Sequence, residues 1–199
     1  MLYSVLKKLF YFIFEYLCRW QVTGIGRIPE TGPIIIISNH VSYWDPIVLG
    51  VISKRQVYFM AKAELFRIPV FSSILRGLGA FPVDRKKSDR AALRAAAEVL
   101  ERGDVLGMFP EGTRIRTGEL GEFKLGAVLI AAKSKTPIVP VALQGTSKIF
   151  SRGWFRPFKV AVGNPYYWDD MEERKLTSKE LQEITNNIKE QILIELAGI

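Results

Sequence analysis

The residues best suited to chemistry lie in one short stretch, Ile34 to Asp45, with the sequence IIIISNHVSYWD. His40 is the only histidine of the chain, and Asp45 follows it five residues later. An imidazole with an unperturbed pKa of about 6.5 accepts a proton at neutral pH. A neighbouring carboxylate would hold the ring in one tautomer and stabilise the cation that forms. The pair therefore predicts general-base chemistry or, equally from this stretch alone, a buried structural histidine bonded to a helix cap.

Two predicted elements position this pair. The four isoleucines 34–37 follow Pro33 and predict a short, fully buried strand. Asp45 and Pro46 precede an apolar run, which predicts a helix with Asp45 as its N-cap and Pro46 at its first position. His40 and Asp45 then share a loop at the carboxyl end of a strand, where α/β sheets place their sites.

The composition narrows the class of protein. The 199 residues fit one domain, and a hydrophobic content of 48% is too high for disorder. One cysteine, Cys18, excludes a disulfide framework and favours a reducing compartment. One cysteine and one histidine cannot supply the three protein ligands that a zinc ion usually needs, so no metal site is expected. The net charge of +8 predicts an anionic partner, which is a nucleic acid, a phosphorylated substrate or an acidic lipid surface.

Residues 1–20, MLYSVLKKLFYFIFEYLCRW, are mostly apolar or aromatic. At 100° per residue the polar side chains fall on one arc of a helical wheel. Such a helix is about 30 Å long and is in principle able to span a bilayer. Its four charged residues share that arc, which favours a helix lying in the membrane interface. The alternative is a core helix packed on the domain, and one helix can do both.

The remaining chain alternates between strand-like and helix-like segments. We expect strands at 34–37, 57–61, 79–83, 105–109, 138–143 and 158–162. We expect helices at 46–53, 64–78, 89–102, 124–135 and 177–196, the last opened by a capping box of Thr177 and Glu180. This alternation predicts an α/β fold with a mixed, largely parallel central sheet flanked by helices.

A basic segment lies between Phe123 and Trp168, with seven Lys or Arg residues and no Asp or Glu. Aromatic residues such as Trp154 and Phe155 are interleaved with the basic ones. This mixture is typical of single-stranded nucleic acid binding or of a membrane headgroup region. A solvated basic face with a few aromatics turned to the core explains it equally well.

Four ordered motifs resemble those of the glycerolipid acyltransferases. Asn39 to Asp45 resembles that family's His-x4-Asp motif, and GAFPVDR at 79–85 resembles its second motif. FPEGTR at 109–114 and IVPVA at 138–142 resemble the third and fourth, and AKAEL at 61–65 is similar to a phosphate-contacting segment. The resemblance covers about residues 20 to 165 and is closest to the bacterial 1-acyl-glycerol-3-phosphate acyltransferases. The chain departs from the pattern at Ile115, where the family usually has serine, and at Pro82.

The resemblance implies transfer of a fatty acyl group from an acyl thioester to the sn-2 hydroxyl of lysophosphatidic acid, giving phosphatidic acid. The donor is acyl-CoA or acyl-acyl carrier protein, and no other cofactor is implied. His40 would act as general base and Asp45 would orient it, without a covalent acyl-enzyme. The implied phosphate ligands are Arg85, Arg114 and Lys62, and the other implied substrate contacts are Glu111, Gly112 and Thr113. Glu111 would bond the glycerol region or fix an arginine, and an internal salt bridge between Glu111 and Arg114 is the structural alternative.

Other functions remain open at this stage. Glycerol-3-phosphate or another lysophospholipid is an alternative acceptor. A non-catalytic basic module for membranes or nucleic acid is an alternative of another class, but it leaves His40, Asp45 and Glu111 without a purpose, so no nucleic acid partner is expected. We therefore expect a membrane-interface helix at 1–20 and an acyltransferase domain at 21–199. The protein would lie on the cytoplasmic face of the cell membrane, as a peripheral or monotopic protein on an anionic surface.

Overall fold

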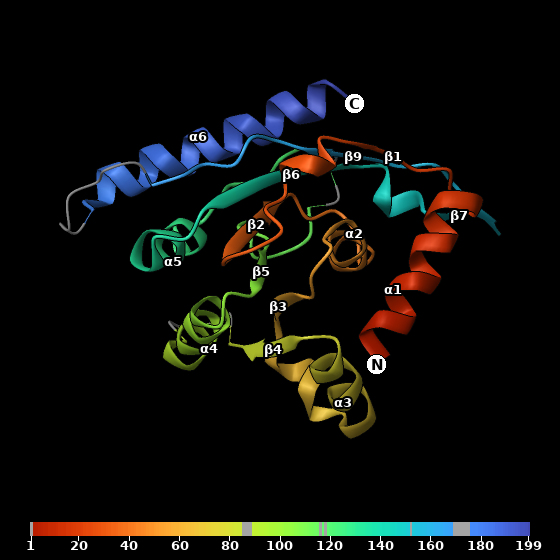
Figure 1. The fold of residues 1–199 in the computed structure, drawn as a ribbon, viewed down its shortest axis with the longest axis horizontal. Helices are drawn as coiled ribbons and strands as arrows, with labels where there is room; N and C mark the ends of the chain where they lie inside the picture. Colours follow the sequence, from red (N-terminus) through yellow and green to blue (C-terminus); the bar gives the residue numbers. More distant parts are fainter. Residues whose placement is uncertain (1, 85–88, 116, 118, 152, 169–175) are drawn as a thin grey trace.

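A mixed β-sheet forms the centre of the computed structural model of the chain, which describes residues 2–84, 89–115, 117, 119–151, 153–168 and 176–199. In these residues the sheet consists of β1 (Gln21–Thr23), β2 (Ile34–Ser38), β3 (Val57–Lys62), β4 (Ala80–Val83), β5 (Val105–Met108), β6 (Ile138–Gln144) and β9 (Lys159–Val162). Its strand order is β1-β9-β6-β2-β5-β3-β4 (Figure 1). Neighbouring strands are parallel except for β6 and β9. The expected mixed, largely parallel sheet is therefore confirmed.

Helices cover both faces of this sheet. They are α1 (Leu2–Phe12), α2 (Asp45–Ile52), α3 (Pro69–Gly77), α4 (Arg90–Glu101), α5 (Gly126–Ser134) and α6 (Ser178–Ala197). Ile34 and Ile36 of β2 pack in the cluster that contains α2, whereas Ile35 and Ile37 pack with α4, α5 and α6, because successive strand residues face opposite sides. Figure 1 shows α1 outside α2, and α3 at the β4 end of the sheet. All five residues of β2 are consequently buried, as expected.

Short turns and a small hairpin complete the described fold. The turns are the π-helical η1 (Ile13–Leu17) and the 3₁₀-helical η2 (Ile25–Arg27), η3 (Ala63–Arg67) and η4 (Thr146–Lys148). The hairpin pairs β7 (Phe150–Ser151) with β8 (Trp154–Phe155). The three residues of β1 were not predicted as a strand, because so short a segment carries no readable periodicity.

The helix expected over residues 64–78 is divided in two. Ile68 is extended, with φ −91° and ψ 111°, and it separates η3 from α3. The residue before a proline is pushed out of the helical region, and Pro69 then opens α3. The capping box of α6 is confirmed, since the side chains of Thr177 and Glu180 each bond the other residue's backbone N–H.

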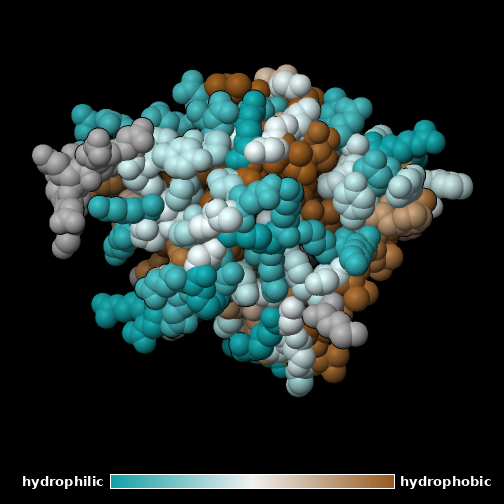
Figure 2. All heavy atoms as spheres, viewed as in Figure 1, coloured by the Kyte–Doolittle hydropathy of each residue, from teal (hydrophilic) through white to brown (hydrophobic). Residues whose placement is uncertain are grey.

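The N-terminal segment is helical but is not one regular helix. α1 ends at Phe12, and the chain passes through η1 before Arg19 turns with φ 52°. In the described part of the chain no helix combines the length and the hydropathy needed to cross a bilayer. Hydrophobic side chains gather towards the side of the molecule where α1 and α3 lie (Figure 2).

Candidate active site

The loop that carries His40 begins where β2 and β6 diverge. The side-chain amide of Asn39 donates to the carbonyl of Leu143 at 2.9 Å, and the backbone N–H of Leu143 donates to Oδ1 of Asn39 at 2.8 Å. This buried side chain takes the place of the next backbone pair between the two strands. It thereby holds the start of the loop to β6 and sets the position from which His40 extends.

His40 and Asp45 are in direct contact. Nδ1 of His40 lies 2.8 Å from Oδ2 of Asp45, and the side chains are 12% and 0% exposed. An ionised carboxylate can only accept hydrogen bonds, so Nδ1 carries the proton of the neutral imidazole. Nε2 is then left with a free lone pair. The five-residue spacing therefore produces a histidine in the tautomer that a general base needs.

Asp45 is not the N-cap that its sequence position predicted. It is the first residue of α2, and Trp44 stands at the cap position without a side-chain cap bond. The carboxylate turns back into the preceding loop, where Oδ2 also accepts the N–H groups of Val41 and Ser42, each at 2.7 Å. The prediction was wrong because those loop amides, with the His40 ring, compete for the same oxygen.

A threonine distant in sequence completes the set of bonds around this carboxylate. The hydroxyl of Thr146 donates to Oδ1 of Asp45 at 2.6 Å, and both residues are buried. Thr146 follows Gly145 directly after β6, at the carboxyl edge of the strand next to β2. The sequence analysis missed Thr146, and the only sequence signal that pointed to it was its position just after a strand that ends at this edge. With both oxygens bonded, the carboxylate is fixed in the orientation that His40 requires.

We expect Thr146→Val to weaken this arrangement measurably. Valine keeps the shape of threonine but leaves Oδ1 of Asp45 without its donor in a buried site. Hydrogen bonds to charged groups contribute about 1.5–3 kcal/mol, so the free energy of unfolding should fall by about that amount. Thr146→Ser, which keeps the hydroxyl, should recover most of it. Urea denaturation measures both variants, and a Val variant as stable as the wild type would contradict the role of this bond.

The loop after β5 holds His40 from the other side. The ring of Phe109 stacks on the imidazole, with centroids 4.1 Å apart and planes inclined by 19°. Oε2 of Glu111 accepts the backbone N–H of His40 at 2.8 Å, and the N–H of Ile115 donates to the His40 carbonyl at 2.8 Å. The imidazole and its backbone are thus bonded or stacked on several sides, which limits the motion of the ring.

Both carboxylate oxygens of Glu111 accept backbone N–H groups. Its other oxygen, Oε1, accepts the N–H of Gly121 at 3.0 Å, so the carboxylate joins the loop after β5 to the His40 loop. Desolvation by burial raises the pKa of Glu111. Among the ion pairs of the described residues, none joins Glu111 to Arg114. The structural alternative of an internal salt bridge is therefore wrong, and a direct contact of Glu111 with substrate stays a prediction.

The next three residues of this loop, Gly112 to Arg114, are at least partly exposed. Gly112 has φ 70°, a conformation that other residues rarely adopt, and Thr113 is exposed. The guanidinium carbon of Arg114 lies 3.4 Å from the ring centroid of Tyr43, a cation–π contact that links the loop to the His40 loop. Arg114 is therefore held beside the loop that carries His40.

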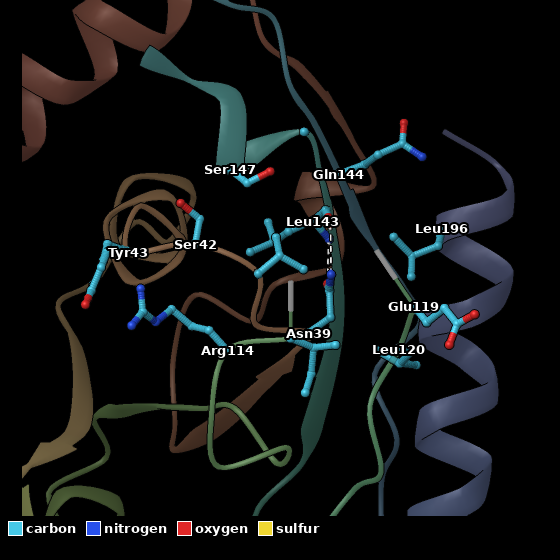
Figure 3. A pocket seen from close by; sticks show the side chains of 13 residues that line it. Asn39, Ser42, Tyr43, Arg114, Glu119, Leu120, Leu143, Gln144, Ser147 and Leu196 are labelled. Atoms are coloured by element: carbon cyan, nitrogen blue, oxygen red, sulfur yellow. Dashed lines mark hydrogen bonds between the residues drawn. The ribbon is translucent and has the colours of Figure 1, made fainter. Parts of the chain in front are cut away.

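A hollow of about 540 Å³ opens beside the His40 loop (Figure 3). Figure 3 shows Arg114 directed toward Tyr43 and Ser42 on one side of it, with Gln144 and Leu196 on the other. The lining residues are Asn39, Val41, Ser42, Tyr43, Arg114, Ile115, Glu119, Leu120, Leu143, Gln144, Gly145, Ser147 and Leu196. Its volume is within the range of small-molecule sites. The hollow offers the Arg114 cation, the Glu119 carboxylate and several hydroxyl and amide groups beside the loop that carries the candidate base.

Lys62, another of the expected phosphate ligands, ends a different strand at the same edge of the sheet. Lys62 is the last residue of β3, and its ammonium lies 3.2 Å from Oε1 of Glu64, with both side chains largely exposed. β3 ends at the same sheet edge as β2, with β5 between them. Arg85 lies outside the described residues. The structure thus places Arg114 beside the base and Lys62 farther along the same edge.

Other chemistries find little support in the described residues. No group of three or more His, Cys, Asp or Glu side chains there is arranged to hold a metal ion. Cys18 is buried beside the core, and this burial raises its pKa to about 11. A thiol with that pKa is protonated at neutral pH and is a poor nucleophile.

Comparison with known proteins gives consistent matches. Residues 19–144 match the model of the family described as Acyltransferase, a region that includes His40, Asp45 and Arg114 but ends before Thr146. The chain is 36% identical over 177 residues to the 1-acyl-sn-glycerol-3-phosphate acyltransferase of Bacillus subtilis, covering 86% of this chain and 85% of that protein. It is 32% identical over 180 residues to the protein of the same name from Borreliella burgdorferi, covering 89% and 72%.

A solved structure supports the same relationship. The crystal structure of the 1-acyl-sn-glycerophosphate (LPA) acyltransferase PlsC from Thermotoga maritima superposes with a TM-score of 0.72 and 27% sequence identity. The superposition covers 94% of this chain and 78% of that one. The similarity therefore extends from the sequence to the arrangement of most of the fold.

Proposed function

The chain belongs to the acyltransferase family, and from that premise we propose that it transfers a fatty acyl group from an acyl thioester to the sn-2 hydroxyl of lysophosphatidic acid. The observation that carries this proposal is the 2.8 Å contact of His40 with Asp45, in a loop whose other residues line a hollow together with Arg114. The names of the two relatives and of the structural neighbour support the same acceptor.

The proposed chemistry begins with the lone pair on Nε2 of His40. Nε2 takes the hydroxyl proton of the acceptor as that oxygen forms a bond to the thioester carbonyl carbon. When the tetrahedral intermediate collapses, the carbon–sulfur bond breaks and the imidazolium returns the proton to the leaving thiolate. Asp45 stabilises the imidazolium between these steps, and general-base help of this kind contributes about 10²–10⁴-fold.

This route needs no covalent acyl-enzyme, because the acceptor hydroxyl is itself the nucleophile. The protonated thiol of Cys18 in the core agrees with that route. The thioester is already activated for acyl transfer, so the reaction requires no cofactor beyond its donor, acyl-CoA or acyl-acyl carrier protein. Phe109 and Glu111 serve the same chemistry indirectly, since they hold the ring and the backbone of His40 in place.

The acceptor's phosphate is assigned to Arg114. A guanidinium offers a planar pair of donors that matches two phosphate oxygens, and the Tyr43 ring beneath it sets its direction. Lys62 ends β3, and Arg85 comes two residues after the end of β4 in the sequence. Both would add positive charge around the same headgroup. Gly112 and Thr113 lie next to Arg114 in the chain and would contact the glycerol region.

Residues 1–20 are proposed to seat the protein on the cytoplasmic face of the cell membrane, peripherally or as a monotopic protein. Two side chains of α1 bond the protein: the Tyr3 hydroxyl donates to the Gly50 carbonyl, and the Lys7 ammonium donates to the Ser53 carbonyl. The exposed side of α1 combines the apolar Leu2, Val5, Leu9 and Phe12 with polar residues, among them Lys8. Large exposed apolar side chains beside a lysine are typical of a helix in the membrane interface, so this surface supports contact with lipid. Binding to the membrane favours a lysolipid as acceptor, because the soluble glycerol-3-phosphate would not require it.

The proposal is tested by product formation. Purified protein in detergent is incubated with acyl-CoA or acyl-acyl carrier protein and with lysophosphatidic acid, glycerol-3-phosphate or monoacylglycerol. We expect phosphatidic acid from lysophosphatidic acid with at least one donor, and much slower acylation of the other two acceptors. Faster acylation of glycerol-3-phosphate would replace the proposed acceptor, and no product with either donor would overturn the proposal.

A further inference from the structure

The segment between β3 and β4 carries apolar side chains that no part of the described protein covers. None of the residues of η3 or α3 is buried. Val70 is 74% exposed and Ile68 is 59% exposed, and Leu65, Phe71 and Ile74 are exposed as well. Short helices of soluble proteins are stabilised mainly by packing an apolar face, and this one presents apolar side chains to the outside.

This apolar surface continues that of α1. A Cβ atom added at Gly77, the last residue of α3, would lie 3.5 Å from Cδ2 of Leu2. Figure 1 places the N-terminal end of α1 next to α3, and Figure 2 shows hydrophobic side chains on this side of the molecule. The outward side of α1 and the exposed residues of α3 therefore belong to one surface.

The charges around α3 indicate what kind of partner covers it. Arg67 and Arg76 are exposed at its two ends, and α3 itself contains no Asp or Glu. The nearby Glu64 is paired with Lys62. Basic side chains beside exposed apolar ones fit anionic lipid headgroups above acyl chains. A second copy of the chain would bring like charges together on such a surface.

We propose that α3 is a second lipid-contacting element, which together with α1 seats the protein on an anionic bilayer. One helix lying in the interface leaves the protein free to rotate about the helix axis, whereas two contacts fix that rotation. η3 begins directly after β3 ends, at the sheet edge that carries the His40 loop. The second contact therefore holds this edge at a set height over the membrane, from which a lysolipid enters.

The direct test attaches an environment-sensitive fluorophore to a cysteine at a chosen surface position. Val70→Cys reports on α3, Val5→Cys reports on α1, and Leu193→Cys on α6 is the matched control for an exposed apolar position elsewhere. The native Cys18 is buried and protonated, so it leaves the added cysteine as the reactive one. We expect the probes at positions 70 and 5 to shift to the blue on vesicles of phosphatidylcholine with phosphatidylglycerol, and the probe at 193 to stay unchanged.

A second measurement uses vesicle flotation of the full chain. Ile68→Ser with Val70→Ser should lower the bound fraction on the same vesicles about tenfold or more, because two apolar side chains no longer enter the acyl region. Leu193→Ser with Ile194→Ser should float like the wild type. Thermal unfolding checks that each variant is folded.

Three results would overturn this inference. They are an unshifted probe at position 70 when the probe at position 5 responds, unchanged flotation of the Ile68 and Val70 variant, and a probe shift that follows protein concentration without vesicles. The last would assign the surface to a second copy of the chain. The same measurements on the His40→Ala background separate membrane seating from the proposed catalysis, since they require no turnover.

Discussion

We expect His40→Ala to lose nearly all acyl transfer while the protein stays folded. The Nε2 lone pair is the proposed base, and no other imidazole exists in the chain to replace it. A general base contributes about 10²–10⁴-fold, so the turnover number should fall within or beyond that range. Asp45 keeps its bonds from Val41, Ser42 and Thr146 in the variant, so the loop should hold its shape.

The measurement pairs initial rates of phosphatidic acid formation with thermal unfolding of the same preparation. A rate that falls by orders of magnitude at a nearly unchanged unfolding midpoint assigns the loss to chemistry. A large loss of stability would instead give His40 the structural role that the sequence alone left open. Near-normal turnover would remove His40 from the mechanism altogether.

The second large effect is expected for substitutions of Arg114, which should weaken recognition of the acceptor's phosphate without removing the catalytic base. A phosphate monoester carries about 1.5–2 negative charges at neutral pH. Loss of a partner to a buried charge costs about 2–5 kcal/mol, and the lower end of that range corresponds to about 30-fold. Arg114→Ala should therefore lower kcat/KM for lysophosphatidic acid by about 30-fold or more. Arg114→Lys should restore only part of it, because the charge returns without the planar pair of donors.

The control for this variant is another arginine that also lies over a tyrosine. Arg102 stacks on Tyr58 at 5.4 Å and pairs with Asp104, just before β5 begins and hence at the opposite edge of the sheet. Arg102→Ala should leave kcat/KM for lysophosphatidic acid nearly unchanged. Slow transfer to monoacylglycerol, which lacks phosphate, should scarcely respond to Arg114→Ala. An equal loss on both acceptors would mean that Arg114 supports the loop and not the phosphate.

Much of the fold follows from local patterns in the sequence. The isoleucine run became the buried β2, the capping box opened α6, and the alternation of segments became the mixed sheet with helices on both faces. These features are readable because a strand, a cap or a helical period depends on residues a few positions apart. The His40–Asp45 contact belongs to this class, since both residues share one loop.

Tertiary structure decided the features that join distant parts of the chain. Thr146 bonds Asp45 across 101 residues, and Asn39 bonds Leu143 across 104. Local spacing predicted Asp45 as a helix cap, but in the folded loop its carboxylate accepts the N–H groups of Val41 and Ser42 instead. The wheel of residues 1–20 defined a polar and an apolar side, whereas tertiary packing determined which residues face inward, among them Tyr3, Lys7 and Phe10. Partners of this kind depend on which strands become neighbours and which way a helix docks, and both are set by the packing of the whole chain.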